Sequence, residues 1–219
     1  MAELTWAVVP SNGRSYLDGC LRSLRDQVDG IVVVANDDFD PGDLGPDVVV
    51  VKDAGVDRNI SRWWNLGLEA AEGLARARGR DPWNALVVND DVVCPPHLVR
   101  TLADKLREYR AAIAYPNQRD DVEAVWTRAE PVNLFHRITG YCFMLAGESG
   151  LRLDEQFVWW AGDDDLFWRG NQAGGSVLVP GCRVEHLSPN GSFALYPELN
   201  AQAGRDMESF ARKWGRRPW

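Results

Sequence analysis

The sequence is poor in the residues from which metal centres and nucleophilic sites are most often built. Its 219 residues include only three histidines and four cysteines. No two cysteines form a Cys-x-x-Cys pair, and their wide spacing argues against a zinc site or a disulfide framework. Reduced, buried thiols in a cytosolic protein are the simpler interpretation, so we expect a cytoplasmic location. The cysteines are Cys20, Cys94, Cys142 and Cys182.

Several signature segments are also missing. The chain has no Gly-x-x-x-x-Gly-Lys, no Gly-x-Gly-x-x-Gly and no Gly-x-Ser-x-Gly, which weakens P-loop, dinucleotide-binding and serine-hydrolase interpretations. No stretch approaches eighteen apolar residues and no basic segment precedes the first apolar run, so we expect neither a signal peptide nor a membrane span. The net charge of −8 disfavours general affinity for nucleic acid or anionic membranes. The C-terminal tail is nevertheless basic, with Arg205, Arg212, Lys213, Arg216 and Arg217.

Apolar and helical patterns alternate through the first half of the chain. The expected strands are Leu4–Val9, Ile31–Ala35, Val48–Val51 and Ala85–Val88, and the expected helices begin near Ser15, Ile60 and Pro95. This order predicts an α/β fold with a mixed, mostly parallel sheet flanked by helices. Without repeats, low-complexity segments or linkers, the length favours one domain over residues 1–219.

The second half is less regular. We expect a polar surface loop at Gln118–Val132, a strand at Ile138–Ala146 and a short helix at Asp165–Gln172. Two further strands are expected at Ser176–Val179 and Arg183–Glu185. An amphipathic helix follows, with its apolar face formed by Leu199, Ala203, Met207, Phe210 and Trp214.

Polar residues follow three of the early strands. They are Ser11-Asn12, Asn36-Asp37-Asp38 and Asn89-Asp90-Asp91. In open α/β sheets, ligands bind beyond the carboxyl ends of the strands, so these clusters should converge on one edge. Asp90 and Asp91 could hold a hard divalent cation, and residues 36–38 could recognise a nucleobase and ribose. Turns rich in Asn and Asp for backbone reasons are the alternative.

A second acidic cluster, Asp163-Asp164-Asp165, follows Trp159 and Trp160 and precedes a lone histidine, His186. Each carboxylate raises the cost of ionising the others, so the run needs solvent, a cation or a substrate nearby. A solvated loop is the plain alternative. His186 suits Mn²⁺ as an additional ligand, although a lone histidine is more often structural. The tryptophans could form an acceptor platform or pack beneath the loop.

The order of these segments resembles the family 2 glycosyltransferases, which have the GT-A fold. The resemblance covers roughly residues 4–192. Residues 7–14 resemble the opening strand and nucleotide-binding turn, and Val87–Val93 the strand with the Asp-x-Asp metal motif. The other similar segments are residues 20–24, residues 31–38, Arg62 with Asn65-Leu66-Gly67-Leu68, Thr139-Gly140 with residues 142–145, Ala161–Arg169 and Glu185-His186.

The resemblance implies a division of roles along the chain. Residues 1–93 would form a nucleotide-binding half, residues 94–192 an acceptor and catalytic half, and residues 193–219 a C-terminal helix and basic tail. Asp91 and His186 would hold Mn²⁺ or Mg²⁺, and Asp163 would be the catalytic base. The acceptor side would include Gly140, Trp159, Trp160 and Asp164. The nucleotide sugar would bind at Pro10, Ser11, Asn12, Arg14, Asn36, Asp37, Asp38, Arg62, Asn65, Asn89 and Asp90.

Two positions depart from the family pattern. Asn89 replaces the first acid of Asp-x-Asp, and Gly162 stands where the later segment usually has Glu. A shift of one residue in that segment would make Asp164 the base instead of Asp163. Asp165 and Arg169 are expected to anchor the helix and loop.

The sequence therefore predicts an inverting, metal-dependent glycosyltransferase that uses a UDP-, GDP- or TDP-sugar. Its acceptor could be a glycan, a lipid-linked intermediate, a protein or a modified nucleobase in DNA. The alternatives are a sugar-phosphate nucleotidyltransferase and a non-catalytic binder of nucleotide sugars or carbohydrates. The turn at residues 10–14 has little glycine for the first alternative, whereas Gly162 and the tryptophans suggest the second.

Overall fold

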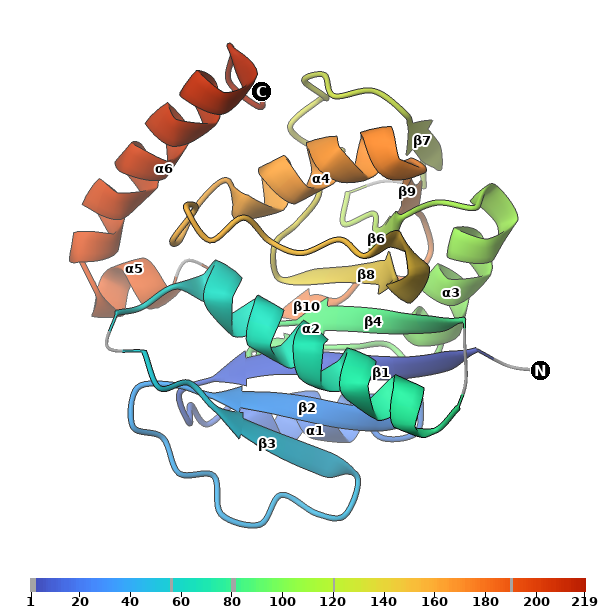
Figure 1. Ribbon diagram of the computed structural model, residues 1–219, viewed down its shortest axis with the longest axis vertical. Coiled ribbons are helices and arrows are strands. Elements are labelled where there is room, and N and C mark those ends of the chain that lie inside the picture. The colour runs from blue at the N-terminus through green and yellow to red at the C-terminus, as the bar shows by residue number, and fades with distance from the viewer. Residues whose placement is uncertain (1–2, 56, 80–81, 120, 190) are drawn as a thin grey trace.

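A mixed sheet of eight strands organises the chain. The computed structural model describes residues 3–55, 57–79, 82–119, 121–189 and 191–219 (Figure 1). The strands of the sheet lie in the order β3-β2-β1-β4-β8-β6-β9-β7, and β10 and β5 form a separate two-stranded ladder. This arrangement confirms the predicted α/β class.

The first four strands are parallel and begin close to their predicted positions. Their bounds are β1 Leu4–Ser11, β2 Gly30–Ala35, β3 Val48–Lys52 and β4 Trp83–Val88. In their register, Val8 lies beside Val32 on one side and Val87 on the other. The carboxyl ends of β1, β2 and β4 therefore meet at one edge, as the sequence predicted.

Helices cover both faces of the sheet (Figure 1). Their bounds are α1 Leu17–Leu24, α2 Ile60–Ala77, α3 Leu98–Tyr109 and α4 Gly162–Ala173. One core cluster contains Val8, Val87 and the apolar sides of α2 and α4. The other contains Val9, Val88 and the apolar sides of α1 and α3, because successive strand residues point to opposite faces. Gly67 allows α2 to approach β1 closely, since a Cβ there would lie 2.2 Å from Val8 Cγ1.

The second half departs from the predictions at several elements. Its strands are β5 Val92–Val93, β6 Ile113–Pro116, β7 Ala124–Trp126, β8 Cys142–Ala146, β9 Ser176–Val179 and β10 Glu185–His186. The prediction of a loop throughout 118–132 was wrong, because β7 pairs with β9 at the edge of the sheet. The strand predicted from Ile138 begins only at Cys142, since a turn closed by Cys142 N and Thr139 O precedes it. The buried strand β6 was not predicted.

Helix α4 begins at Gly162, three residues before its predicted start. The residue before it, Ala161, is fully buried with φ 58°, a left-handed conformation that non-glycine residues seldom adopt. A 3-10 turn, η1 Gly147–Ser149, lies earlier in the chain, and α5 Gly191–Leu195 follows β10. The long final helix, α6 Glu198–Trp214, confirms the predicted amphipathic helix and stands along one side of the molecule (Figure 1).

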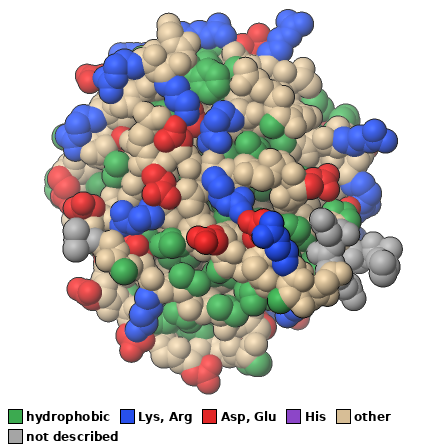
Figure 2. Space-filling view, in the orientation of Figure 1, with side chains coloured by type: hydrophobic (Ala, Val, Ile, Leu, Met, Phe, Trp, Pro, Cys, Tyr) green, Lys and Arg blue, Asp and Glu red, His purple; other side chains and the backbone are tan. Residues whose placement is uncertain are grey.

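Charged side chains of both signs are interspersed over the face seen in Figure 2, so the described residues present no broad field of one sign there. Among the described helices, none is both long enough and apolar enough to cross a bilayer.

Candidate active site at the carboxyl ends of the strands

A cavity of about 550 Å³ lies beyond the carboxyl ends of β1, β2 and β4. Segments from the whole length of the chain line it, including the turn after β1, the start of α2, the loop before β8 and the loop before α4. Most of the predicted site residues are among the lining: Pro10, Ser11, Asn12, Arg14, Asn36, Asp37, Asn89, Asp90, Asp91, Gly140, Trp159, Trp160, Asp163 and His186.

Asp91 and His186 meet through the short β5–β10 ladder. His186 pairs with Val92, and Leu187 N donates to Asp91 O at 2.8 Å. This pairing leaves His186 Nε2 3.3 Å from Asp91 Oδ1, yet that buried oxygen accepts no hydrogen bond of normal geometry from any residue that the structure describes. The Tyr141 ring stacks on the imidazole with centroids 4.3 Å apart and restricts its orientation.

These two groups fit a hard divalent cation. An orphaned carboxylate oxygen beside an imidazole nitrogen is a suitable pair of ligands for Mn²⁺, and Mg²⁺ often takes one or two carboxylates with phosphate oxygens and water completing its shell. Among the described residues, no three His, Cys, Asp or Glu side chains group closely enough to hold a metal by themselves. A cation here would therefore need ligands from the substrate.

Asp90 supports the turn after β1. Its Oδ2 accepts a hydrogen bond from Ser11 Oγ at 2.6 Å, and Ser11 Oγ accepts one from Gly13 N at 3.1 Å. Burial raises the pKa of Asp90 to about 6; the Ser11 hydrogen bond and the Arg14 charge oppose this rise, and the Asp91 charge adds to it. The turn and the acidic strand end therefore act as one unit.

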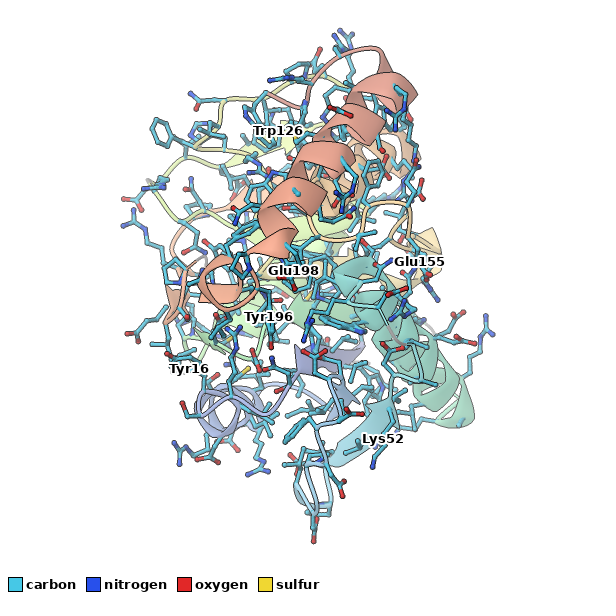
Figure 3. The ribbon with its side chains drawn as sticks, turned by 90° about the vertical axis from the view of Figure 1, so that its left-hand side faces the viewer. Tyr16, Lys52, Trp126, Glu155, Tyr196 and Glu198 are labelled. Carbon is cyan, nitrogen blue, oxygen red and sulfur yellow. The ribbon has the colours of Figure 1, made fainter. Side chains whose placement is uncertain are left out.

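Asp37 belongs to a polar cluster whose members line the cavity. It adopts φ 53°, and its Oδ2 accepts from Arg58 Nε at 3.0 Å and from Tyr196 Oη at 3.4 Å. The Arg58 guanidinium lies 3.8 Å from the Tyr196 ring centroid, and Asn12 Nδ2 donates to Tyr196 Oη at 3.3 Å. Tyr196 lies where the link between α5 and α6 meets the strands of the first half (Figure 3).

The three adjacent aspartates of α4 have different surroundings. Asp163 lines the cavity, with its Oδ2 3.4 Å from Arg137 Nη2. Asp164 is buried and accepts two hydrogen bonds from Arg137, at 2.7 and 3.0 Å. Burial raises the pKa of Asp164 to about 8; the Asp163 charge adds to the rise, and Arg137 opposes it. Asp164 does not line the cavity.

Gly140 gives Asp163 its space. A Cβ at this position would lie 3.0 Å from Asp163 Oδ2 and 3.2 Å from Asp163 Cγ. Any larger residue would push the carboxylate from its present place. The loop before β8 thus helps to set the position of the Asp163 side chain.

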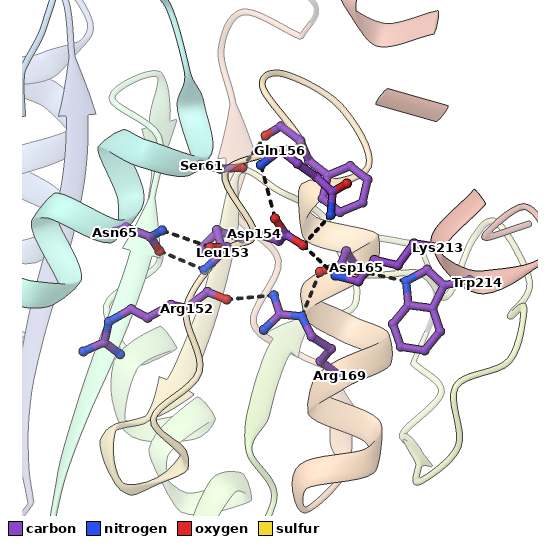
Figure 4. A network of polar contacts seen from close by, with 11 residues as sticks. Ser61, Asn65, Arg152, Leu153, Asp154, Gln156, Asp165, Arg169, Lys213 and Trp214 are labelled. Carbon is purple, nitrogen blue, oxygen red and sulfur yellow. Dashed lines mark hydrogen bonds and ion pairs between the residues drawn. The ribbon is translucent and has the colours of Figure 1, made fainter. Parts of the chain in front are cut away.

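Asp165 is not among the residues that line the cavity, and its contacts tie α4 to α6 (Figure 4). Its Oδ2 accepts from Arg169 Nε at 2.8 Å, and its Oδ1 accepts from Trp214 Nε1 at 2.9 Å. Lys213 Nζ lies 2.8 Å from the same Oδ1 and 2.7 Å from Asp154 Oδ2. This network anchors the helix, as predicted for Asp165 and Arg169.

A buried carboxylate of α6 holds the Trp159–Trp160 loop. Asp206 Oδ2 accepts from the backbone N–H groups of both tryptophans, at 2.7 and 2.8 Å, and its Oδ1 accepts from Gln202 at 2.7 Å. The Trp159 ring packs edge-on against Trp63, and Trp160 packs against Phe193 of α5. The two rings therefore pack against neighbours while lining the cavity.

Three predicted nucleotide-sugar ligands lie outside the cavity lining. Asp38 is exposed with φ 61°. Arg62 makes two hydrogen bonds to Asp53, at 2.8 and 3.1 Å. Asn65 bonds the backbone of Leu153 through both ends of its amide, at 2.8 and 2.9 Å (Figure 4). These contacts tie α2 to its flanking loops.

Several lining residues were not singled out from the sequence, namely Arg58, Trp64, Arg137, Tyr141 and Tyr196. Arg58 and Tyr196 reach the cavity through contacts between distant segments, for which a single sequence has no signal. Arg137 and Tyr141 flank Thr139-Gly140, so their nearness to a recognised motif was a usable sign. Trp64 was placed on the apolar face of its helix.

Residues 5–153 match the sequence model of the MobA-like NTP transferase domain, and the chain therefore belongs to that family. The match includes the turn after β1, Asp91 and Gly140, but it ends before Asp163 and His186. No curated protein sequence matches the chain.

Solved structures with similar folds include glycosyltransferase-type proteins at low identity. S. aureus TarS 1–349 aligns with TM-score 0.60 and 12% identity, over 91% of this chain and 65% of that chain. A longer TarS structure aligns with TM-score 0.57 and 14% identity, over 87% and 38%. GalNAc-T7 with UDP, GalNAc and Mn²⁺ aligns with TM-score 0.59 and 13% identity, over 84% and 43%.

These likenesses concern the fold, and this chain spans less than two thirds of each of those chains. The chain is a single α/β domain with a GT-A-like fold, in a family of nucleotide-binding transferases.

Proposed function

We propose that the chain is an inverting, metal-dependent glycosyltransferase that moves a sugar from a nucleotide-diphosphate sugar to an acceptor hydroxyl. One observation carries this proposal: Asp163 lines the same cavity as the Asp91–His186 pair and the turn after β1. A carboxylate and a two-ligand cation site facing one cavity are what inverting transfer from a diphosphate donor requires.

The donor would bind along the carboxyl ends of β1, β2 and β4. Asp37 offers acceptor oxygens to a nucleobase or ribose, and Arg14 carries positive charge beside the buried acids of the strand end. Asp91 and His186 would hold Mn²⁺ or Mg²⁺, and the bound ion would neutralise the charge of the leaving diphosphate. The Tyr141 ring, stacked on His186, would keep that ligand in place.

Asp163 would be the catalytic base. Its carboxylate would accept the proton of the acceptor hydroxyl while the acceptor oxygen forms a bond to the anomeric carbon. The bond between that carbon and the phosphate oxygen would break, and its electron pair would leave with the nucleoside diphosphate. Asp164 is a weaker candidate because its carboxylate is buried against Arg137 and is not among the residues that line the cavity.

The acceptor would approach over Gly140, Trp159 and Trp160, which line the cavity on the Asp163 side. Flat aromatic surfaces bind sugars and nucleobases, so a glycan, a lipid-linked intermediate and a modified nucleobase in DNA remain candidate acceptors. Most of the rate enhancement would come from aligning the two substrates in the cavity.

Nucleotidyl transfer is the second candidate function, and the family match to MobA-like NTP transferase domains favours it. Such an enzyme would use a nucleoside triphosphate and release pyrophosphate. Asp163 and His186 both lie outside the matched residues, so the match assigns neither of them a role.

One pair of assays separates the two functions. The protein would be incubated with Mn²⁺ and UDP-glucose, GDP-mannose or TDP-glucose, and release of the nucleoside diphosphate would be measured with and without pooled glycan acceptors. A parallel reaction with a nucleoside triphosphate and a sugar 1-phosphate would be assayed for pyrophosphate. We expect nucleoside diphosphate release only; pyrophosphate release without it would refute the glycosyltransferase. Binding without turnover in either reaction would identify a non-catalytic binder.

A further inference from the structure

Trp64 of α2 carries an unpaired indole N–H inside the cavity lining. The residue is 4% exposed, and its Nε1 donates to no acceptor among the residues that the structure describes. Leaving a buried donor unpaired is costly, so such groups usually have a partner. Two other tryptophans follow that rule: Trp63 Nε1 donates to Asp53 at 2.7 Å, and Trp214 Nε1 donates to Asp165 at 2.9 Å. Because Trp64 lines the cavity, a ligand can supply the missing acceptor.

Asn89 carries the complementary unpaired group. Within the described part of the chain, its Oδ1 is a buried acceptor without a hydrogen-bond partner, and Asn89 lines the same cavity. Asn89 follows β4, two residues beyond Val87, which belongs to the same core cluster as Trp64. Asn89 N donates to Tyr141 O at 3.0 Å, which extends the β4–β8 pairing one residue past Val88 and Cys142. Since strand residues two apart share a face, we expect Asn89 to continue the face of β4 that α2 covers.

The chemistry of the two groups selects the ligand. Trp64 Nε1 only donates, and Asn89 Oδ1 only accepts. A phosphate or carbonyl oxygen would satisfy the indole alone. A hydroxyl accepts from one neighbour and donates to another, so it can satisfy both groups.

The position of Trp64 indicates which part of the substrate would supply this hydroxyl. The indole packs edge-on against Phe143 of β8, with centroids 5.7 Å apart. One turn earlier on α2, Ser61 Oγ donates to Phe157 O at 2.6 Å, next to the loop that leads to Asp163. Asn89 directly precedes Asp90 and Asp91. Trp64 and Asn89 therefore line the same cavity as the cation pair and the candidate base, where we expect a donor sugar to be held.

We infer that Trp64 Nε1 and Asn89 Oδ1 form a subsite for a hydroxyl of the donor sugar. This inference depends on the proposed glycosyltransferase function and deepens it, because it requires a donor whose sugar has a free hydroxyl at the matching position. Trp64 is then a specificity-determining residue, which the family pattern did not assign.

Trp64→Phe tests the subsite, since it removes the N–H and keeps an aromatic ring. Calorimetric titration with Mn²⁺ would compare UDP-glucose with UDP, GDP-mannose with GDP and TDP-glucose with TDP. The comparison uses the nucleotide sugar that the wild-type protein binds most tightly. We expect the variant to bind this nucleotide sugar about five- to tenfold more weakly than the wild type does. Affinity for the nucleoside diphosphate should be unchanged.

Trp6→Phe is the matched control. Trp6 is 2% exposed and also has an unpaired Nε1, but it is not among the residues that line the cavity. We expect this variant to bind both nucleotide forms like the wild type. A test that needs no variant uses nucleotide sugars lacking one hydroxyl at a time. One such analogue should bind the wild type about five- to tenfold more weakly, and Trp64→Phe should not distinguish it from the parent sugar.

Three results would overturn the inference. The first is that Trp64→Phe keeps the wild-type affinities, and the second is that it loses affinity equally for the nucleotide sugar and for the nucleoside diphosphate. The third is that every deoxy analogue binds the wild-type protein as tightly as the parent nucleotide sugar does. A wild-type protein that binds none of these nucleotide sugars would instead refute the proposed function itself. The two failures are therefore distinguishable.

Discussion

Asp90–Asp91 and Asp163–Asp165 are both runs of adjacent carboxylates, but the fold treats them differently. The first run follows a strand, and both of its side chains line the cavity, held by Ser11 and by nearness to His186. The second run begins a helix, where successive side chains point in different directions. Asp163 lines the cavity, Asp164 is buried and pairs with Arg137, and Asp165 accepts a hydrogen bond from Trp214 of α6.

The comparison between the two runs shows that adjacent aspartates in a sequence need not have the same role in the structure. In the helix, Asp163 and Asp164 both contact Arg137 of the loop before β8. Asp165 instead contacts Arg169 of α4 and two residues of α6, Lys213 and Trp214. The start of a helix also favours negative charge, so the three carboxylates are tolerated there. What separates a chemical group from a structural one is the set of neighbours around each carboxylate.

The largest expected effect belongs to Asp163→Asn, which removes the candidate base and keeps the side-chain shape. Sugar transfer should fall about 10²- to 10⁴-fold, because no other described carboxylate of α4 lines the cavity. Affinity for the nucleotide sugar, measured by calorimetry, should stay the same. Full transfer by a correctly folded variant would exclude Asp163 as the base.

Asp165→Ala should act on stability. It would leave Trp214 Nε1 without its acceptor and Arg169 and Lys213 without a buried anion, so we expect the free energy of unfolding to fall by about 2–4 kcal/mol in urea titrations. Asp18→Ala is the matched control, because Asp18 and Arg22 form the same i,i+4 pair with the aspartate 71% exposed. That change should cost less than about 1 kcal/mol. Equal losses would contradict the anchoring role.

Asp91→Ala would test the first acidic run. Losing this carboxylate should weaken Mn²⁺-dependent binding of the nucleotide sugar by at least about 10- to 100-fold, which is the loss seen when only a hydrogen-bond partner of a metal ligand is removed. Calorimetric titration of the donor with and without Mn²⁺ measures the effect. If the variant keeps the wild-type dependence on Mn²⁺, the cation site lies elsewhere.

The smallest effect concerns pH. The pKa of Asp164 is about 8 in the folded protein, against about 3.9 in an unfolded chain. Between these values the folded protein holds a proton that the unfolded chain has released, so the free energy of unfolding should decrease as the pH rises. Asp164→Asn should reduce the decrease between pH 5 and pH 8 by about 1–2 kcal/mol. Identical pH dependence in variant and wild type would argue against a buried, protonated Asp164.

The first half of the fold was readable from sequence because its signals are local. Apolar strands, periodic helices and polar strand ends appear as contiguous patterns, and the strand ends met at one edge as predicted. The edge strand β7 was missed because its three residues lie in a polar stretch. The strand β10 was placed early because a two-residue ladder carries almost no pattern of its own.

The candidate site was only partly readable for a related reason. Motif order pointed to residues that line the cavity, among them Asp91, Asp163 and His186. Arg62 and Asn65 belong to the same resemblance, but the fold turns them toward structural partners. Trp64 looked like an ordinary core residue, since helical spacing cannot show that one edge of its ring lacks a hydrogen-bond partner.

The hydrogen bonds from the backbone of Trp159 and Trp160 to Asp206 have a consequence for any shortened form of the chain. The resemblance ends near Ser192 and the family match ends at residue 153, so a shortened protein ending at 192 would keep Asp91, Asp163 and His186. It would lose the carboxylate that holds the backbone of Trp159 and Trp160, next to the left-handed Ala161. We therefore expect such a shortened protein to hold the loop that leads to Asp163 less firmly, because α6 supplies this contact.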